Sequence, residues 1–227
     1  MKISFIKFCL LIFIFEACAP IYVPNVINAP LLSNKNELQA SINTGTSGFD
    51  PQIAYAVTDN IGIMLNGSFK DSKSDSLEDY HKHQFGEIGI GYYKKLDENA
   101  RFEVFTGFGY GKIKAYTEFA FLNDYVNLES YRFFIQPDIG ITNKIIDASF
   151  STRFIVFNTI NNNINYNRMF LEPALTFRVG YKYIKFSVQV GYSFALSSSI
   201  INYEPFIFSI GLHAKLFRNY SNSKTVY

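Results

Sequence analysis

The sequence has no tryptophan, only two cysteines and few charged residues. Charged side chains make up 18% of its 227 residues, below the roughly 25% of ordinary soluble domains. The formal net charge is +2 and the basic residues are scattered, so composition predicts no nucleic-acid partner. The sequence also lacks a phosphate-binding Gly-Lys-Ser/Thr loop and zinc-spaced cysteine and histidine clusters, and we expect no cofactor.

The N-terminus has the pattern of an export signal. Lys2 and Lys7 provide a basic start, and residues 3–15 are almost wholly apolar before the stretch FEACAP. The apolar run is short for a membrane-spanning helix and suits the hydrophobic part of a signal peptide. We therefore predict a signal peptide over residues 1–17.

Two cleavage positions are open. The triplet at 17–19 has the small-x-small form of an ordinary signal, but Pro20 would then follow the cut, where proline is poorly accepted. Cleavage before Cys18 avoids this problem and resembles a bacterial lipobox, although Phe15 and Glu16 depart from its usual pattern. We predict a lipidated Cys18; the alternative is a secreted chain with a free cysteine.

The other cysteine, Cys9, lies inside the predicted signal, so no internal disulfide is expected. Residues 19–36 read APIYVPNVINAPLLSNKN and combine three prolines with asparagines and apolar residues. This composition predicts an extended linker over residues 18–36.

From residue 37 on, helical periodicity is absent and segments with a period of two recur. They predict an all-β barrel domain over residues 37–217, followed by a polar tail over 218–227. The expected strands are 37–44, 49–57, 61–68, 84–94, 101–114, 128–142, 146–156, 170–181, 184–195 and 206–217.

The lengths of the connections alternate. Connections after the second, fourth, sixth and eighth strands are short, whereas those after the third, fifth, seventh and ninth are long and polar. In an antiparallel meander, the two sets lie at opposite ends. Short turns at one end, long loops at the other and an even strand count are typical of outer-membrane barrels. We predict a ten-stranded, antiparallel, up-and-down transmembrane β-barrel with its long loops outside and both termini in the periplasm.

The glycines indicate which face is inside. Gly107, Gly109 and Gly111 alternate with Phe108 and Tyr110, so one face of this strand is nearly bare and the other is bulky. Small residues suit the crowded interior of a small barrel, and lipid suits the bulky face. A soluble lipocalin-like barrel with the opposite arrangement is the alternative. Tyrosines near strand ends would form an aromatic girdle: Tyr92, Tyr110, Tyr131, Tyr181 and Tyr192.

Three stretches resemble small outer-membrane β-barrel lipoproteins of Gram-negative bacteria, a family mostly without assigned function. They are CAPIYVPN (18–25), GFDPQIAYAVTDNIGIMLNGSF (48–69) and RFEVFTGFGYGK (101–112). The resemblance implies an outer-membrane location and a barrel fold. The last strand also looks like a barrel-assembly signal, with Ser209, Gly211, Ala214 and Leu216, so we expect contact with the barrel-assembly machinery during biogenesis.

A search for catalytic residues gives one acidic cluster, in the predicted long loop after the third strand. It resembles the rim of omptin-type proteases and holds Asp71, Asp75, Glu78, Asp79, His81 and His83. No facing loop supplies a second acidic or histidine cluster, so a proteolytic pair is not predicted. His81 and His83 are a weak candidate for a metal site, and we interpret them instead as part of a solvated loop. His213 is predicted in the lumen, near the opposite end.

Charged residues on the predicted lumenal face balance five to five. The acids are Glu87, Glu103, Asp138, Asp147 and Glu172, and the bases are Arg132, Arg153, Arg178, Lys185 and Lys215. Buried charges need partners, so we predict a lumen filled by paired charges. The predicted function is a non-enzymatic, structural or surface-binding outer-membrane lipoprotein with an unknown ligand; alternatives are a narrow solute channel and a soluble lipid-binding barrel.

Overall fold

The computed structural model describes residues 20–73, 80–119, 122–160, 167–196 and 202–217. All regular structure in these ranges is β-strand, and no helix there is long and apolar enough to cross a membrane. The strands are β1 (Leu38–Gly45), β2 (Gly48–Ala56), β3 (Ile61–Lys73), β4 (Tyr80–Lys95), β5 (Ala100–Phe119), β6 (Leu122–Thr142), β7 (Ile146–Ile160), β8 (Asn167–Tyr181), β9 (Ile184–Tyr192), β10 (Phe194–Ala195) and β11 (Phe206–Phe217).

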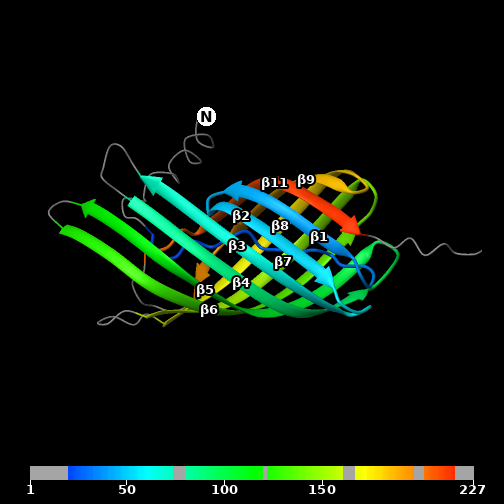
Figure 1. Ribbon diagram of the computed structural model, residues 1–227, viewed down its shortest axis with the longest axis horizontal. Coiled ribbons are helices and arrows are strands. Elements are labelled where there is room, and N and C mark those ends of the chain that lie inside the picture. Colours follow the sequence, from blue (N-terminus) through cyan, green and yellow to red (C-terminus); the bar gives the residue numbers. More distant parts are fainter. Residues whose placement is uncertain (1–19, 74–79, 120–121, 161–166, 197–201, 218–227) are drawn as a thin grey trace, which may run out of the picture.

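The strands close into a barrel (Figure 1). From β1 to β9, each strand pairs antiparallel with the next, and β11 pairs antiparallel with both β9 and β1 to close the sheet. β9 and β10 are two parts of one strand, separated at Ser193, and both pair with β8. The predicted ten-stranded, antiparallel, up-and-down fold is therefore confirmed.

The strands are longer than expected at one end. β5 and β6 continue their pairing out to Phe119 and Leu122, and β3 and β4 pair as far as Lys73 and Tyr80. Much of what the sequence indicated as long polar loops is therefore strand, because a ladder of backbone hydrogen bonds does not depend on side-chain polarity. We call this end the long-strand end and the opposite end the short-turn end; both are visible in Figure 1.

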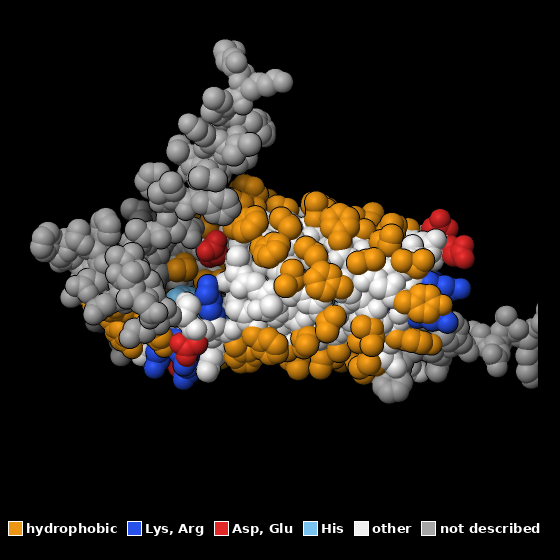
Figure 2. Space-filling view, turned by 90° about the horizontal axis from the view of Figure 1, so that it is seen from above, with side chains coloured by type: hydrophobic (Ala, Val, Ile, Leu, Met, Phe, Trp, Pro, Cys, Tyr) orange, Lys and Arg blue, Asp and Glu red, His pale blue; other side chains and the backbone are white. Residues whose placement is uncertain are grey.

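The two faces of the barrel differ as the glycine pattern predicts. Phe108 and Tyr110 on β5 are exposed on the outside, and large apolar side chains cover the outer surface between charged groups at the two ends (Figure 2). The glycines on the inner face leave room for inward-facing aromatic rings. A Cβ at Gly107 would lie 2.6 Å from the Phe134 ring, and one at Gly109 would lie 2.5 Å from the Phe85 ring.

The described chain begins inside this barrel. Residues 20–36, here called the plug segment, form no strand beyond one isolated bridge, and residues 22–33 are buried. The segment runs through the interior from the long-strand end to the short-turn end, where β1 begins (Figure 1). The expectation that both termini lie at the short-turn end is therefore wrong for Pro20. The chain there lies at the end opposite to the C-terminal residue of β11.

Candidate functional site

The candidate site is the lumen, where the plug segment meets the inner face of the barrel. At the long-strand end, the backbone N–H of Ile21 donates to the Asn202 carbonyl at 2.8 Å, and Tyr22 forms an isolated parallel bridge with Tyr203. At the short-turn end, the N–H of Asn36 donates to the Ala56 carbonyl at 2.8 Å. These contacts attach both ends of the plug segment to the barrel wall.

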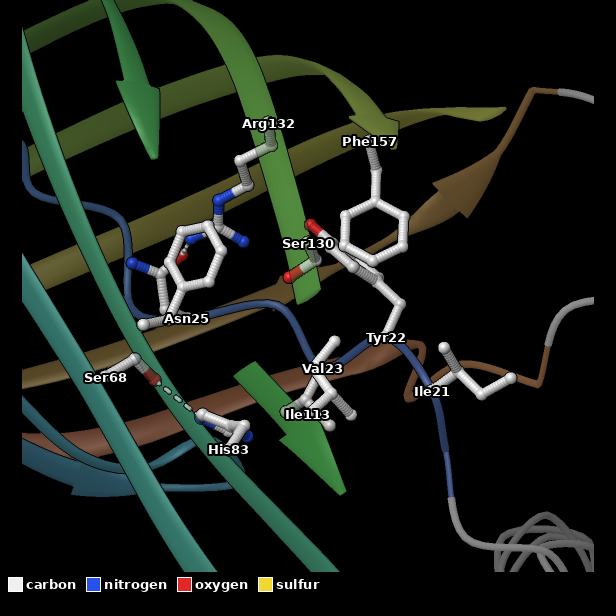
Figure 3. A pocket seen from close by; sticks show the side chains of 11 residues that line it. Ile21, Tyr22, Val23, Asn25, Ser68, His83, Ile113, Ser130, Arg132 and Phe157 are labelled. Carbon is white, nitrogen blue, oxygen red and sulfur yellow. Dashed lines mark hydrogen bonds between the residues drawn. The ribbon is translucent and has the colours of Figure 1, made fainter. Parts of the chain in front are cut away.

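Tyr22 anchors the plug segment near the long-strand end. Its ring stacks on Phe170 with centroids 4.1 Å apart and meets the edge of Phe157 at 5.0 Å. Its hydroxyl donates to Glu172 Oε1 at 2.5 Å. Figure 3 shows Tyr22 beside Phe157, with Asn25 further along the same segment. A buried tyrosine is well placed when its ring packs and its hydroxyl finds an acceptor, and both conditions are met here.

A network of charged side chains surrounds Asn25, three residues after Tyr22 in the plug segment. Arg132 donates from Nε to Glu87 at 2.7 Å, and Arg153 donates from Nη2 to Glu172 at 2.7 Å. The Asn25 side chain joins the network, because its amide donates to Glu87 at 2.8 Å and its oxygen accepts from Arg132 at 2.5 Å. The plug segment thus joins a network of charges that belong to four different strands, β4, β6, β7 and β8.

The wall also holds the main chain of the plug segment. Gln189 on β9 accepts from the Ile27 N–H and donates to the Ile27 carbonyl, both at 2.8 Å. Gln52 donates to the Val26 carbonyl at 2.7 Å, and Gln136 donates to the Asn28 carbonyl at 2.8 Å. Buried backbone groups need partners, and the inward-facing glutamine side chains supply them here.

A turn in the plug segment contacts the short-turn half of the lumen. Leu31 has a φ of 54°, and the successive N–H groups of Leu31 and Leu32 donate to Glu103 at 2.9 and 2.6 Å. Successive N–H groups in such a turn form a small anion-binding concavity. The leucine side chains point to glycines of the wall: a Cβ at Gly62 would lie 2.5 Å from Leu32, and one at Gly140 would lie 3.0 Å from Leu31.

All ten residues of the predicted charge network are buried in the lumen. Seven of them form ion pairs. Arg132 pairs with Glu87, Arg153 with Glu172 and Glu87, and Lys185 and Lys215 with Asp147. The other three make hydrogen bonds instead. Glu103 binds the turn described above, Asp138 accepts from Gln136 at 2.9 Å, and Arg178 donates to the Ala29 carbonyl at 2.9 Å.

One strip of the inner wall holds several buried polar atoms that make no hydrogen bond to the described residues. They lie on β1, β7, β8 and β11 and are Gln39 Oε1, Asp147 Oδ2, Ser149 Oγ, Ser151 Oγ, Arg178 Nε and both ring nitrogens of His213. Buried polar atoms without a protein partner are ordinarily satisfied by water. His213 is lumenal, as the sequence predicted, and it pairs in register with Lys185 near the short-turn end.

The interpretation of His81 and His83 as part of a solvated loop is wrong. Both lie on β4, are buried and face inward. His81 Nε2 lies 2.9 Å from His83 Nδ1, and His83 Nε2 lies 2.9 Å from the Ser68 hydroxyl. Asp71 lies at the same level on the outer face, where it pairs with Lys82 at 2.6 Å. The two histidines therefore lie closer to the long-strand end than the apolar outer surface of the barrel.

Burial lowers the pKa of His81 to about 4 and that of His83 to about 3, so both rings are neutral at neutral pH. The described residues contain no group of three or more histidine, cysteine or acidic side chains that could hold a metal ion. Three members of the acidic cluster, Asp75, Glu78 and Asp79, lie outside the described residues, as does Cys18.

Sequence reasoning found the wall of the site but missed its central element, the plug segment. The available signal was its composition, because NVINAPLL (25–32) is too apolar for a solvated linker. The complementary signal was the row of glycines on the inner face, which leaves hollows for other side chains. Searches with the sequence find no matching protein-family model and no similar curated protein.

Proposed function

We propose that this protein is a non-enzymatic outer-membrane β-barrel lipoprotein, anchored at Cys18, with a structural or surface-binding role. The observation that carries the proposal is the distribution of polarity. Apolar side chains such as Phe133, Leu175 and Leu212 are about half exposed on the outer face, and charged side chains are buried inside. Water would solvate the apolar outer face poorly, whereas lipid suits that face and a polar lumen suits the buried charges.

The extent of the apolar outer surface along the strands also supports a membrane location. On β8, the outward-facing residues Leu175, Phe177, Val179 and Tyr181 are all exposed. Tyrosines also face outward near strand ends on β4 and β9, at Tyr92 and Tyr192, and Tyr110 faces outward in the middle of β5, two residues before the exposed Lys112. Apolar bands flanked by aromatic residues are characteristic of outer-membrane barrels. The barrel-assembly machinery and outer-membrane lipids are therefore the partners we expect during and after biogenesis.

Membrane fractionation tests this proposal directly. The protein should remain in the outer-membrane fraction after washes with high salt and alkaline carbonate, and it should be released by detergent. Folded protein in detergent should migrate differently from boiled protein on a gel, because a closed barrel resists unfolding. Recovery in the soluble fraction without detergent would refute the membrane proposal and support the soluble lipid-binding alternative.

The long-strand end is the proposed surface-binding region. β5 and β6 extend beyond the neighbouring strands at this end (Figure 1), and exposed polar groups lie where this extension begins, including the Lys112–Glu129 ion pair of 3.2 Å. Tyr125 is 60% exposed at the same end and could pack against a ligand. We propose that this end faces the exterior of the cell.

A narrow solute channel is the second candidate. The strip of polar atoms around His213 favours it, because such a strip attracts water. The plug segment argues against it, since residues 22–33 fill the centre of the lumen. We therefore propose that the intact protein conducts poorly.

Planar-bilayer recordings distinguish the two candidates. The intact protein should show only small or rare conductance steps, and a variant lacking residues 20–36 should show larger and steadier ones. Lys35→Ala is the matched control, because Lys35 belongs to the plug segment but is exposed, and it should behave like the intact protein. Large, steady channels from the intact protein would make the channel the better proposal.

A further inference from the structure

The plug segment is long enough to cross a membrane. From Ile21 to Asn36 it comprises fifteen steps along the chain, and an extended chain spans at most about 3.3–3.6 Å per residue, or roughly 50 Å in total. The hydrocarbon core of a bilayer is about 30 Å thick. The contacts of Ile21 and Asn36 with opposite ends of the barrel are consistent with this reach.

The plug segment is held along its whole length. Arg153 donates to the Asn25 carbonyl at 3.1 Å, Gln189 binds both main-chain groups of Ile27, and Glu103 accepts from the N–H of Leu32. These three residues come from β7, β9 and β5. A segment that is hydrogen-bonded to several strands along its length has a defined path, because any other path would break these bonds together.

The path separates the two ends of the described chain. Pro20 lies at the long-strand end, beside the contacts of Ile21 and Tyr22 with the connection that precedes β11. The last residue of β11, Phe217, pairs with Leu38 at the short-turn end. Cys18 precedes Pro20 by two residues, which span at most about 7 Å, so the point of attachment at Cys18 stays near Pro20.

We propose that the barrel holds its own N-terminal segment across the membrane and presents the chain upstream of Pro20 on the side of the long-strand end. If Cys18 is acylated, as the proposed function requires, its acyl group enters the lipid leaflet on that side. With the long-strand end facing outward, this is the outer leaflet of the outer membrane. The lumen then acts as a conduit that carries a lipid anchor to the cell surface.

Single-cysteine labelling tests the crossing in the full-length protein. Ile21→Cys and Ser72→Cys report on the long-strand end, and Lys35→Cys and Glu98→Cys report on the short-turn end; Ser72, Lys35 and Glu98 are exposed and Ile21 is partly exposed. A membrane-impermeant maleimide applied to intact cells should label Ile21→Cys together with Ser72→Cys. Lys35→Cys and Glu98→Cys should react only after the outer membrane is opened.

Labelling of Ile21→Cys together with Glu98→Cys would overturn the proposed crossing. Labelling of the short-turn pair alone in intact cells would retain the crossing and reverse the proposed orientation of the barrel. Incorporation of a fatty-acid analogue is measured in parallel, with Cys18→Ala as the control. Equal incorporation in the control, or none in the wild type, would refute acylation at Cys18 and the placement of the anchor, while the cysteine pairs would still report the crossing.

Discussion

Substitution of Arg153 by methionine tests whether the lumenal charges depend on one another. The Arg153 guanidinium donates twice to Glu172, at 2.9 and 2.7 Å, and lies 3.7 Å from Glu87. The side chains of Arg153 and Glu172 are 1% and 0% exposed. Methionine retains much of the length of the side chain and removes the charge, so the main consequence is an unpaired Glu172 carboxylate.

The expected loss of stability follows from that carboxylate. Breaking a buried ion pair by removing one partner costs about 3–5 kcal/mol. The hydroxyls of Tyr22 and Ser193 still donate to Glu172, which reduces the penalty. We therefore expect a loss at the lower end of this range, roughly 3 kcal/mol.

Equilibrium unfolding by urea in lipid vesicles measures this loss. The double variant Arg153→Met/Glu172→Gln should recover most of the loss at pH 7, because it carries no unpaired charge.

Lys82→Met is the matched control, since it breaks the exposed Lys82–Asp71 pair of 2.6 Å by the same substitution. Exposed pairs contribute little because water and salt screen them. If Arg153→Met and Lys82→Met destabilise the barrel equally, or if the double variant Arg153→Met/Glu172→Gln recovers none of the loss, the buried-charge argument is refuted.

Three further predictions concern the wall, the plug segment and the paired histidines. Phe177→Arg, in the apolar surface of β8, should cost about 2–4 kcal/mol in vesicle unfolding, against about 0–1 for Tyr181→Arg at the strand end; equal costs would contradict the proposed membrane location. Glu103→Gln should weaken the bonds to Leu31 and Leu32 by about 1.5–3 kcal/mol in all and speed amide exchange there, whereas exposed Glu98→Gln should do neither. His81 and His83 have lowered pKa values, so the unfolded chain binds more protons between about pH 6.5 and 4, and wild-type stability should fall as pH decreases through this range. The double variant His81→Gln/His83→Gln should lose that part of the pH dependence, and an unchanged pH profile would show that the histidines are not its source.

The sequence by itself determined the wall of the barrel. The alternation of Phe186, Val188 and Val190 with Ser187 and Gln189 is a local property, because successive residues of a strand point to opposite faces. The number of strands and their order follow from the same repeated pattern and from short connections. The inward position of all ten predicted charges could therefore be derived residue by residue.

Strand ends were less predictable. The polar stretch that includes His81 and His83 has little apolar periodicity, so it indicated a loop. The structure continues β4 through it because β3 and β5 provide pairing partners on both sides. A ladder of backbone hydrogen bonds does not depend on side-chain polarity, and sequence alone does not show where such a ladder stops.

The position of the plug segment inside the barrel was decided only by the tertiary structure. Its contacts join residues far apart in the chain: Tyr22 and Glu172 are 150 positions apart, and Ile27 and Gln189 are 162 apart. The segment has neither the period of a strand nor that of a helix, since its backbone is held by side chains of the wall. Whether such a segment lies outside or inside depends on the space and the unpaired charges of a closed barrel, and these exist only after the barrel has folded.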